Sequence, residues 1–305
     1  MSSSPSEVPP DVPSDFQCAA ASLADAEPQS GTAPIDACWL LVEVPGPWGS
    51  DALTGARMPE PVRAYLAGLD GVRVQLIRRP DGARSTGAQV FVVHLDVADP
   101  TAPALAWATL LPHLDDVLAV DPHAEPSEHD GWEPVTEPTW FCCTNGSRDR
   151  CCALLGRPVT AALAERWPGT TWEVDHLGGH RFAGTLLALP SGLVLGRLDA
   201  DTAAAAAAEV VEGRWPAGHV RGRAGAPAAV QAALAHVVQR RGLSGPDALT
   251  VREVAPDGDA VRVVLDLTEG GSVEQIEVEA TSQQVMRRQS CAKPGLKPAA
   301  WWTTR

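Results

Sequence analysis

Residues with the chemistry of metal ligands or redox thiols are concentrated in one short stretch, from Phe141 to His180. It contains two pairs of adjacent cysteines separated by a polar loop, and two histidines on either side of a Gly-Gly step. These residues are Cys142, Cys143, Cys151, Cys152, His176 and His180. Thiolate sulfur and imidazole nitrogen are ligands of zinc and of iron–sulfur centres. The stretch therefore predicts a metal or redox site that the rest of the chain positions.

Three kinds of site fit these residues. A thiol–disulfide oxidoreductase typically has Cys-x-x-Cys at the start of a helix, where the helix dipole lowers a thiol pKa, but the cysteines here are vicinal. A structural zinc site would fit the ligand types, but its cysteines are usually about two to four residues apart. Here eight residues separate the equivalent cysteines. A [2Fe–2S] cluster is wider than one zinc ion, and two histidines can replace two cysteines on one iron. The spacing favours the cluster, with the other two sites as alternatives.

Strand geometry limits which cysteines can serve together. If residues 141–144 form an extended strand, Cys142 and Cys143 point to opposite faces, so only one of them reaches a given site. Cys142 and Cys151 have the same Cys-x8-Cys spacing as the other two cysteines, so the spacing does not choose between the pairs. The His-Leu-Gly-Gly-His segment that follows predicts a tight loop in which both imidazoles converge, because two glycines disfavour a helix.

The whole motif resembles that of the sucrase/ferredoxin-like family, thioredoxin-like [2Fe–2S] proteins with bis-histidine ligation that include the actin-patch-distribution type. The likeness is carried by Cys-x8-Cys with Arg148 and Asp149 inside it, and by His-Leu-Gly-Gly-His followed by Arg-Phe-Ala-Gly. It is tight over residues 138–198 and looser over residues 39–53. The resemblance implies that the cluster-binding residues, and hence the metal ligands, are Cys143, Cys152, His176 and His180.

The resemblance also implies a one-electron carrier, and we expect an electron-transfer protein rather than a stand-alone enzyme. With two thiolate ligands the oxidised site is neutral, whereas four thiolates would make it doubly negative. Its reduction potential is therefore expected above that of all-cysteine plant-type clusters. The donor or acceptor is expected to be another redox protein, which the residues do not identify. Asn145 and Thr185 depart from the histidine and asparagine common in the family, but neither is an expected ligand.

The expected fold class is α/β. A thioredoxin-like ferredoxin domain is preceded by a second α/β domain, compatible with a degenerate thioredoxin-like unit, and followed by a C-terminal β-meander. From residue 138 the elements follow the order β-loop-α-β-β-β-α. The expected segments are a mostly disordered N-terminus (1–32), an N-terminal α/β domain (33–120), an acidic Pro-rich linker (121–137), the ferredoxin domain (138–245) and the meander with its tail (246–305).

Local patterns predict several individual elements. Leucines at near-helical spacing indicate a helix within residues 101–120. A second helix is expected from about residue 158 to 167, with a proline near its start. A hairpin is expected to turn at residues 190–192, and an alanine-rich helix is expected over residues 202–212.

The overall composition restricts partners and compartment. A formal net charge of −14 disfavours nucleic acid and anionic membranes as partners. No apolar run approaches the roughly eighteen residues of a membrane helix, and the N-terminus lacks the features of a signal peptide, so the chain is expected to be cytoplasmic. An odd total of seven cysteines argues against a disulfide framework. Cys18 and Cys291 lie far from the central stretch in sequence, and packing is the simpler role for both.

Overall fold

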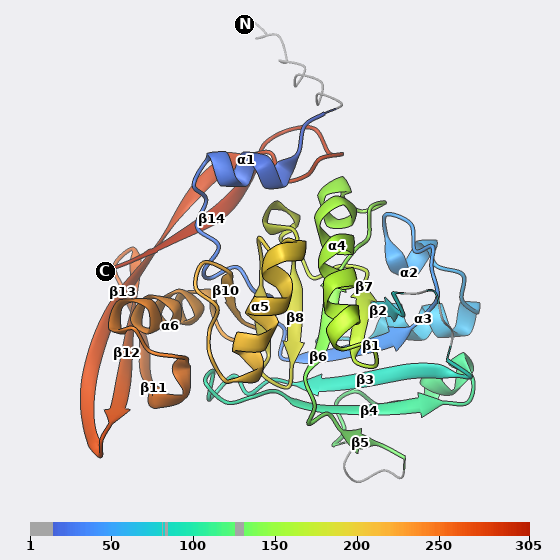
Figure 1. The fold of residues 1–305 in the computed structure, drawn as a ribbon, viewed down its shortest axis with the longest axis horizontal. Coiled ribbons are helices and arrows are strands. Elements are labelled where there is room, and N and C mark those ends of the chain that lie inside the picture. Colours follow the sequence, from blue (N-terminus) through green and yellow to red (C-terminus); the bar gives the residue numbers. More distant parts are fainter. Residues whose placement is uncertain (1–14, 81, 83–84, 126–130) are drawn as a thin grey trace, which may run out of the picture.

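The structure is a computed structural model that describes residues 15–80, 82, 85–125 and 131–305, and it contains two β-sheets with helices packed around the larger one (Figure 1). The α-helices are α1 (Cys18–Ala24), α2 (Ala52–Gly55), α3 (Glu60–Gly68), α4 (Arg150–Arg166), α5 (Ala200–Val211) and α6 (Ala228–Arg241). Short 3-10 helices are η1 (Leu114–Ala119), η3 (His180–Phe182) and η4 (Pro246–Ala248). The strands of the larger sheet are β1 (Cys38–Glu43), β2 (Val72–Arg78), β3 (Ala88–His94), β4 (Leu105–Leu111), β5 (Glu133–Pro134), β6 (Thr139–Cys143), β7 (Thr171–Val174), β8 (Leu186–Leu189), β9 (Leu193–Leu195) and β10 (Val220–Arg223). Those of the smaller sheet are β11 (Leu249–Asp257), β12 (Ala260–Glu269), β13 (Ser272–Arg287) and β14 (Lys297–Thr304).

Two halves of the larger sheet repeat one topology. In each half the order is β-α-β-β-β, formed by β1, α3, β2, β3 and β4 and again by β6, α4, β7, β8 and β9. The first two strands of each half are parallel, and the other pairs are antiparallel. The halves join where β2 pairs antiparallel with β7, so one sheet runs through both. This arrangement confirms the α/β class and the element order that was predicted after residue 138.

The larger sheet curls so that its two halves face each other. Phe91 lies on β3 and Phe141 on β6, with β7, β2 and β1 between these strands in the sheet order. Their ring centroids are nevertheless only 5.2 Å apart. Such a contact across three intervening strands requires strong curvature. The concave face thus forms a core shared by both halves, which includes Trp39, Phe141 and Trp172.

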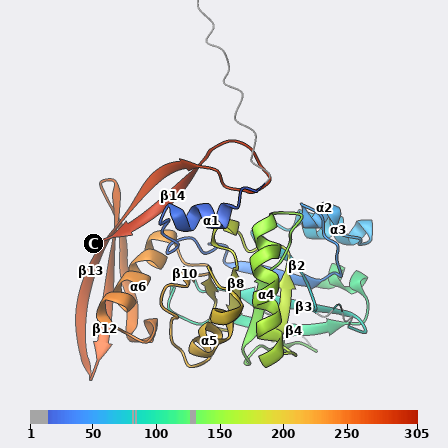
Figure 2. The same cartoon turned by 45° about the horizontal axis from the view of Figure 1, so that its top comes forward.

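Helices cover the outer faces of the curled sheet. The core beside β1 is completed by Val62 and Leu66 of α3, and the core beside β6 by Val159 and Leu163 of α4. The smaller sheet is a four-stranded antiparallel meander, as predicted, and packs against α6 (Figure 2). Burial of these apolar side chains on both faces is the main source of stability.

Two predicted helices differ from the structure. Residues 105–111 form β4, paired antiparallel with β3, although their leucines have near-helical spacing. The segment forms a strand because β3 supplies hydrogen-bond partners along its whole length. Leu105 and Leu110 remain exposed and so do not form the apolar face of a helix. Helix α4 begins at Arg150 instead of near residue 158, because Asp149 caps it, and Pro158 lies inside the helix. The hairpin at residues 190–192 and the alanine-rich helix, as α5, are confirmed.

The first residues of the described chain pack against the C-terminal segment. Figures 1 and 2 both show α1 beside the connection between β13 and β14, above the start of α4. Of the N-terminal stretch that was expected to be mostly disordered, residues 1–14 lie outside the described residues, and residues 18–24 form α1. The predicted linker, residues 121–137, contains β5, which pairs with β4.

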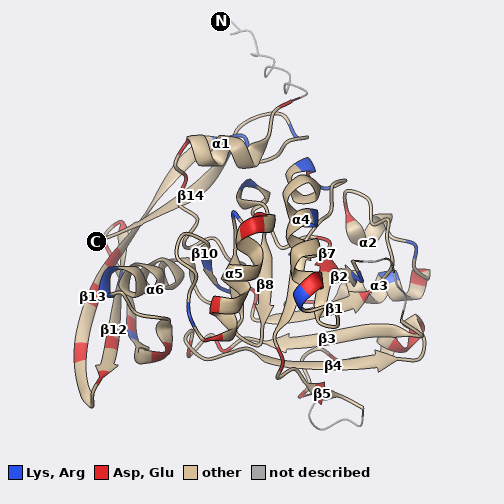
Figure 3. Cartoon of the chain, in the orientation of Figure 1, with Lys and Arg blue, Asp and Glu red and all other residues tan. Residues whose placement is uncertain are grey.

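Charged residues are spread over both sheets and several of the helices (Figure 3). Acidic residues occur on α5, on the smaller sheet and on the strands of the larger one, with basic residues among them. Among the helices within the described ranges, none combines the length and apolar character needed to cross a membrane.

Candidate metal centre

The predicted cysteine ligands lie where β6 leads into α4. Cys143 is the last residue of β6, and Cys152 lies in the first turn of α4. The carboxylate of Asp149 caps this helix by accepting a hydrogen bond from the N–H of Cys151 at 3.0 Å. Because β6 and β7 are parallel, the loops that follow them lie at the same edge of the sheet. The loop after β7 carries both predicted histidines.

Gly156 allows α4 to approach β6 closely. A Cβ at this helical glycine would lie 2.0 Å from the carbonyl oxygen of Cys143, which is closer than a side chain can pack. Glycine in a helix interior costs about 1 kcal/mol relative to alanine, so packing is the physical reason for glycine here. The close contact brings the first turn of α4, with Cys152, toward Cys143.

We expect Gly156→Ala to lower the free energy of unfolding by about 1–3 kcal/mol, because the added methyl group forces α4 away from β6. The same displacement should separate Cys152 from Cys143. Gly68→Ala is the matched control, since Gly68 is also helical and its Cβ position has no atom within 4 Å. Urea unfolding measures both variants, and equal stabilities would contradict the close packing.

Cys143 and Cys152 form a buried thiol pair. The hydrogen bond with Cys152 holds the pKa of Cys143 well below that of an ordinary thiol, against the effect of burial, and the nearby His176 lowers it further. The same hydrogen bond, together with burial, raises the pKa of Cys152 well above its ordinary value. One sulfur of the pair is therefore readily ionised, which metal coordination requires.

His176 and His180 lie beside this pair on the loop between β7 and β8. Their ring centroids are 6.2 Å apart, and the ring planes are inclined by 30°. Gly178 and Gly179, between them, have φ angles of 76° and 67°, in the left-handed region that glycine adopts without strain. The segment is a tight loop, as predicted.

The Nδ1 atoms of both histidines are buried and have no hydrogen-bond partner among the described residues. Leaving such a buried polar atom unpaired costs about 1–3 kcal/mol. A bound group that accepts the lone pairs of these nitrogens would remove that cost. Burial lowers the pKa of His180, which favours the neutral imidazole that metals bind. Thiol sulfur and imidazole nitrogen are donor types that bind zinc ions and [2Fe–2S] clusters.

Arg221 places a buried positive charge beside the thiol pair. No motif in the sequence marked this arginine as part of the site. Its guanidinium donates a hydrogen bond to the carbonyl oxygen of Gly178 at 3.0 Å and so supports the histidine loop. Burial and the nearby Arg73 lower the pKa of Arg221 to about 10, whereas Cys143 and Cys152 act to raise it. The residue stays charged at neutral pH. It lies on β10, a strand too short to give a pattern of its own.

The other two cysteines of the central stretch point elsewhere. Cys142 packs in the core on the outer face of β6, under α4 and α5, whereas Cys143 belongs to the core on the concave face. Cys151 faces away from the thiol pair, toward Cys18 and Cys291. Cys142 and Cys151 therefore face different surroundings from Cys143 and Cys152, a difference that the spacing does not reveal.

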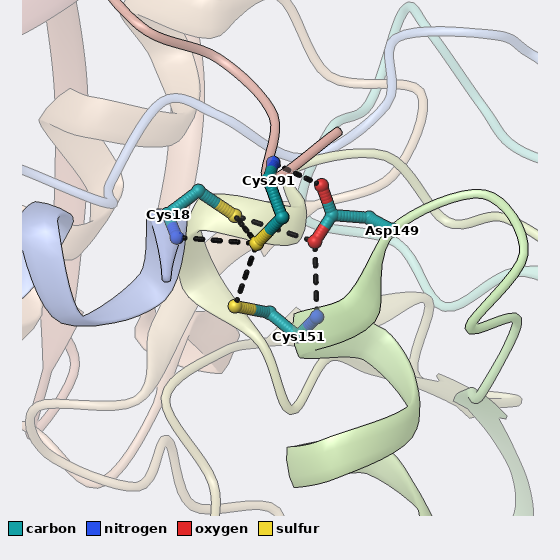
Figure 4. Close-up of side chains that lie close together, drawn as sticks. All are labelled: Cys18, Asp149, Cys151 and Cys291. Atoms are coloured by element: carbon teal, nitrogen blue, oxygen red, sulfur yellow. Dashed lines mark hydrogen bonds between the residues drawn. The ribbon is translucent and has the colours of Figure 1, made fainter. Parts of the chain in front are cut away.

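A second group of ligand-type side chains lies next to the first (Figure 4). It consists of Cys18 from α1, Asp149 and Cys151 at the start of α4, and Cys291 from the connection between β13 and β14. Their ligand atoms all lie within 4.8 Å of one another, and all four residues are buried. The sequence indicated only packing roles for Cys18 and Cys291. These two cysteines are 273 positions apart, and such a separation forms no recognisable motif.

A sequence profile described as sucrase/ferredoxin-like matches residues 30–222, well over half of the chain. The chain belongs to the sucrase/ferredoxin-like family. The matched range contains both cysteine pairs and both histidines of the central stretch. Curated proteins and solved structures gave no match. Membership of this family and the clustered cysteines together are consistent with a bound metal or iron–sulfur cofactor.

Proposed function

We propose that this sucrase/ferredoxin-like protein transfers single electrons through a [2Fe–2S] cluster held by two cysteines and two histidines. The proposed ligands are Cys143, Cys152, His176 and His180. The observation that carries the proposal is the pair of buried imidazole nitrogens that have no hydrogen-bond partner among the described residues and lie near the buried thiols of Cys143 and Cys152. When bound, the cluster would supply a centre that accepts and releases one electron.

The surrounding residues favour electron uptake at this site. Arg221 provides a fixed positive charge near both sulfurs, which stabilises added negative charge in a buried environment. Asp149 lies on the other side, with its carboxylate oxygen 3.9 Å from Nε2 of His180. Burial alone would disfavour its ionisation, but the N–H of Cys291 and the nearby His180 lower the pKa of Asp149. Its negative charge can therefore orient an imidazole N–H.

Electrons would enter and leave by way of His180. Its side chain retains 19% exposure, whereas both cysteine sulfurs are buried. His180 borders a surface cavity of about 130 Å³ that is also lined by Arg148, Lys293 and Lys297. Positive side chains around the opening suit an acidic surface on the redox partner, since complementary charges speed the encounter of two proteins.

The decisive experiment is purification of the full chain without oxygen, followed by iron and acid-labile sulfide analysis and EPR of the reduced protein. We expect two irons and two sulfides per chain, as in one [2Fe–2S] cluster. A colourless protein with zinc at these ligands would replace the proposal with a structural zinc site. Disulfide reductase activity that depends on the vicinal cysteines but not on His176 would instead indicate a thiol oxidoreductase.

Replacing histidine ligands by cysteine should lower the reduction potential. In the double variant His176→Cys with His180→Cys, four thiolates make the site more negative and electron uptake harder. We expect a decrease of about 200 mV or more, by analogy with the gap between Rieske and plant-type ferredoxin centres. Redox titration followed by EPR measures it. Cys142→Ser, which alters a thiol on the outer face, should leave the potential unchanged, and an unchanged potential in the double variant would argue against histidine ligation.

A further inference from the structure

Three cysteine sulfurs from distant parts of the chain converge beside the candidate metal centre (Figure 4). The sulfurs of Cys151 and Cys291 are 3.3 Å apart, and those of Cys291 and Cys18 are 3.5 Å apart. One carboxylate oxygen of Asp149 lies 3.4 Å from the sulfur of Cys18. The three thiols come from α1, from the first turn of α4 and from the connection that precedes β14.

These separations match the edges of a tetrahedral zinc site. With zinc–sulfur bonds of about 2.3 Å and zinc–oxygen bonds of about 2.1 Å, tetrahedral geometry places two sulfurs about 3.8 Å apart and a sulfur and an oxygen about 3.6 Å apart. The three separations given above are shorter than these values by only a few tenths of an ångström, and the remaining ones stay within 4.8 Å. A disulfide, by contrast, needs about 2.05 Å between sulfurs and would leave the third thiol without a partner.

Backbone N–H groups donate hydrogen bonds to one sulfur of the group and to its carboxylate. The N–H of Cys18 donates to the sulfur of Cys291 at 3.3 Å. Asp149 is held in place by the N–H of Cys151 at 3.0 Å and the N–H of Cys291 at 2.8 Å. Its second oxygen also accepts from the hydroxyl of Ser290 at 2.9 Å. Thiol–thiol hydrogen bonds are weak, so three thiols gain little from lying together unless a metal joins them.

We propose that Cys18, Cys151 and Cys291, with a carboxylate oxygen of Asp149, bind one zinc ion at a site separate from the thiol pair on the concave face. Zinc replaces the three thiol protons, which pass to solvent, and no electron is transferred. Four protein donors close the coordination sphere, which is typical of a structural zinc site. The ion would fasten α1 and the C-terminal connection over His180, whose carbonyl oxygen lies 3.6 Å from the sulfur of Cys18.

The test is metal analysis of the full chain, expressed with zinc supplied and purified without oxygen. We expect one zinc per chain in the wild type, and at least about 100-fold weaker zinc binding, measured by chelator competition, in Cys18→Ser and in Cys291→Ser. Cys38→Ser is the matched control, since Cys38 is also buried but its sulfur contacts only the carbonyl oxygen of Pro122 among the described hydrogen-bond partners.

Zinc and iron are counted separately, so this proposal and the proposed electron-transfer function can fail independently. Cys143→Ser should lose iron and keep zinc. The proposal is overturned if the wild type binds no zinc, or if both serine variants bind as much zinc, and as tightly, as the wild type. It is also overturned if mass spectrometry finds a disulfide between any two of the three cysteines. Because the wild type alone decides two of these outcomes, a variant that fails to fold does not block the test.

Discussion

His176→Ala and His180→Ala should each lose most of the bound iron and sulfide, or retain a cluster with a clearly altered EPR spectrum. Each variant removes one of four proposed ligands, and both imidazoles have a buried Nδ1 that no other described residue pairs with. Cys143→Ser and Cys152→Ser should have effects at least as large, because the thiolates carry the negative charge that holds the irons. Iron and sulfide analysis of protein prepared without oxygen measures the loss.

The cysteine doublet provides a matched control for this prediction. Cys142 and Cys143 are adjacent and equally buried, but they lie on opposite faces of β6. Cys142→Ser should therefore keep its iron, with only a modest loss of stability from a polar atom in the core. Loss of iron in Cys142→Ser together with retention in Cys143→Ser would mean that the other register of the motif binds the cluster.

Glu27→Ala should destabilise the protein by about 3–5 kcal/mol, because it removes the buried carboxylate partner of Arg287 and leaves Arg181 ion-paired, among the described residues, only with the half-exposed Asp25. Glu27 is 1% exposed and its carboxylate forms ion pairs with Arg181, at 2.7 Å, and with Arg287. Arg181 is itself 3% exposed and also donates to the carbonyl oxygen of Arg288 at 2.8 Å. This network joins the residues after α1, the 3-10 helix η3 and the end of β13, and denaturant unfolding measures its contribution.

An exposed ion pair gives the contrast. Glu60 and Arg63 pair at 3.1 Å on the surface of α3, where the Glu60 side chain is 79% exposed. Glu60→Ala should change the free energy of unfolding by no more than about 0.5 kcal/mol. If the two alanine variants were equally stable, the buried network could not be what holds α1 and β13 against η3.

The site was predictable from the sequence to the extent that its parts are local. Cys-x8-Cys spans one strand-to-helix connection and His-Leu-Gly-Gly-His one short segment after β7, where Gly178 and Gly179 form the tight loop that the pattern predicted. The hairpin between β8 and β9 and the C-terminal meander were predicted for the same reason, since turn residues act on their neighbours. The segment at 105–111 was predicted wrongly, because its state depends on pairing with β3 rather than on its own leucines.

The sequence by itself determined the donor types, the family motif and the order of elements after residue 138, because these features depend on residues close together along the chain. Only the tertiary structure decided that Cys143 shares a core with Cys152 while Cys142 packs on the opposite face of β6. The close contact at Gly156 fixes the position of α4, and with it Cys152, relative to β6. The tertiary structure also brought Arg221 beneath the histidine loop and gathered three distant thiols around Asp149. No spacing along the chain encodes such contacts, because they arise where the curled sheet, α1 and the connection between β13 and β14 meet.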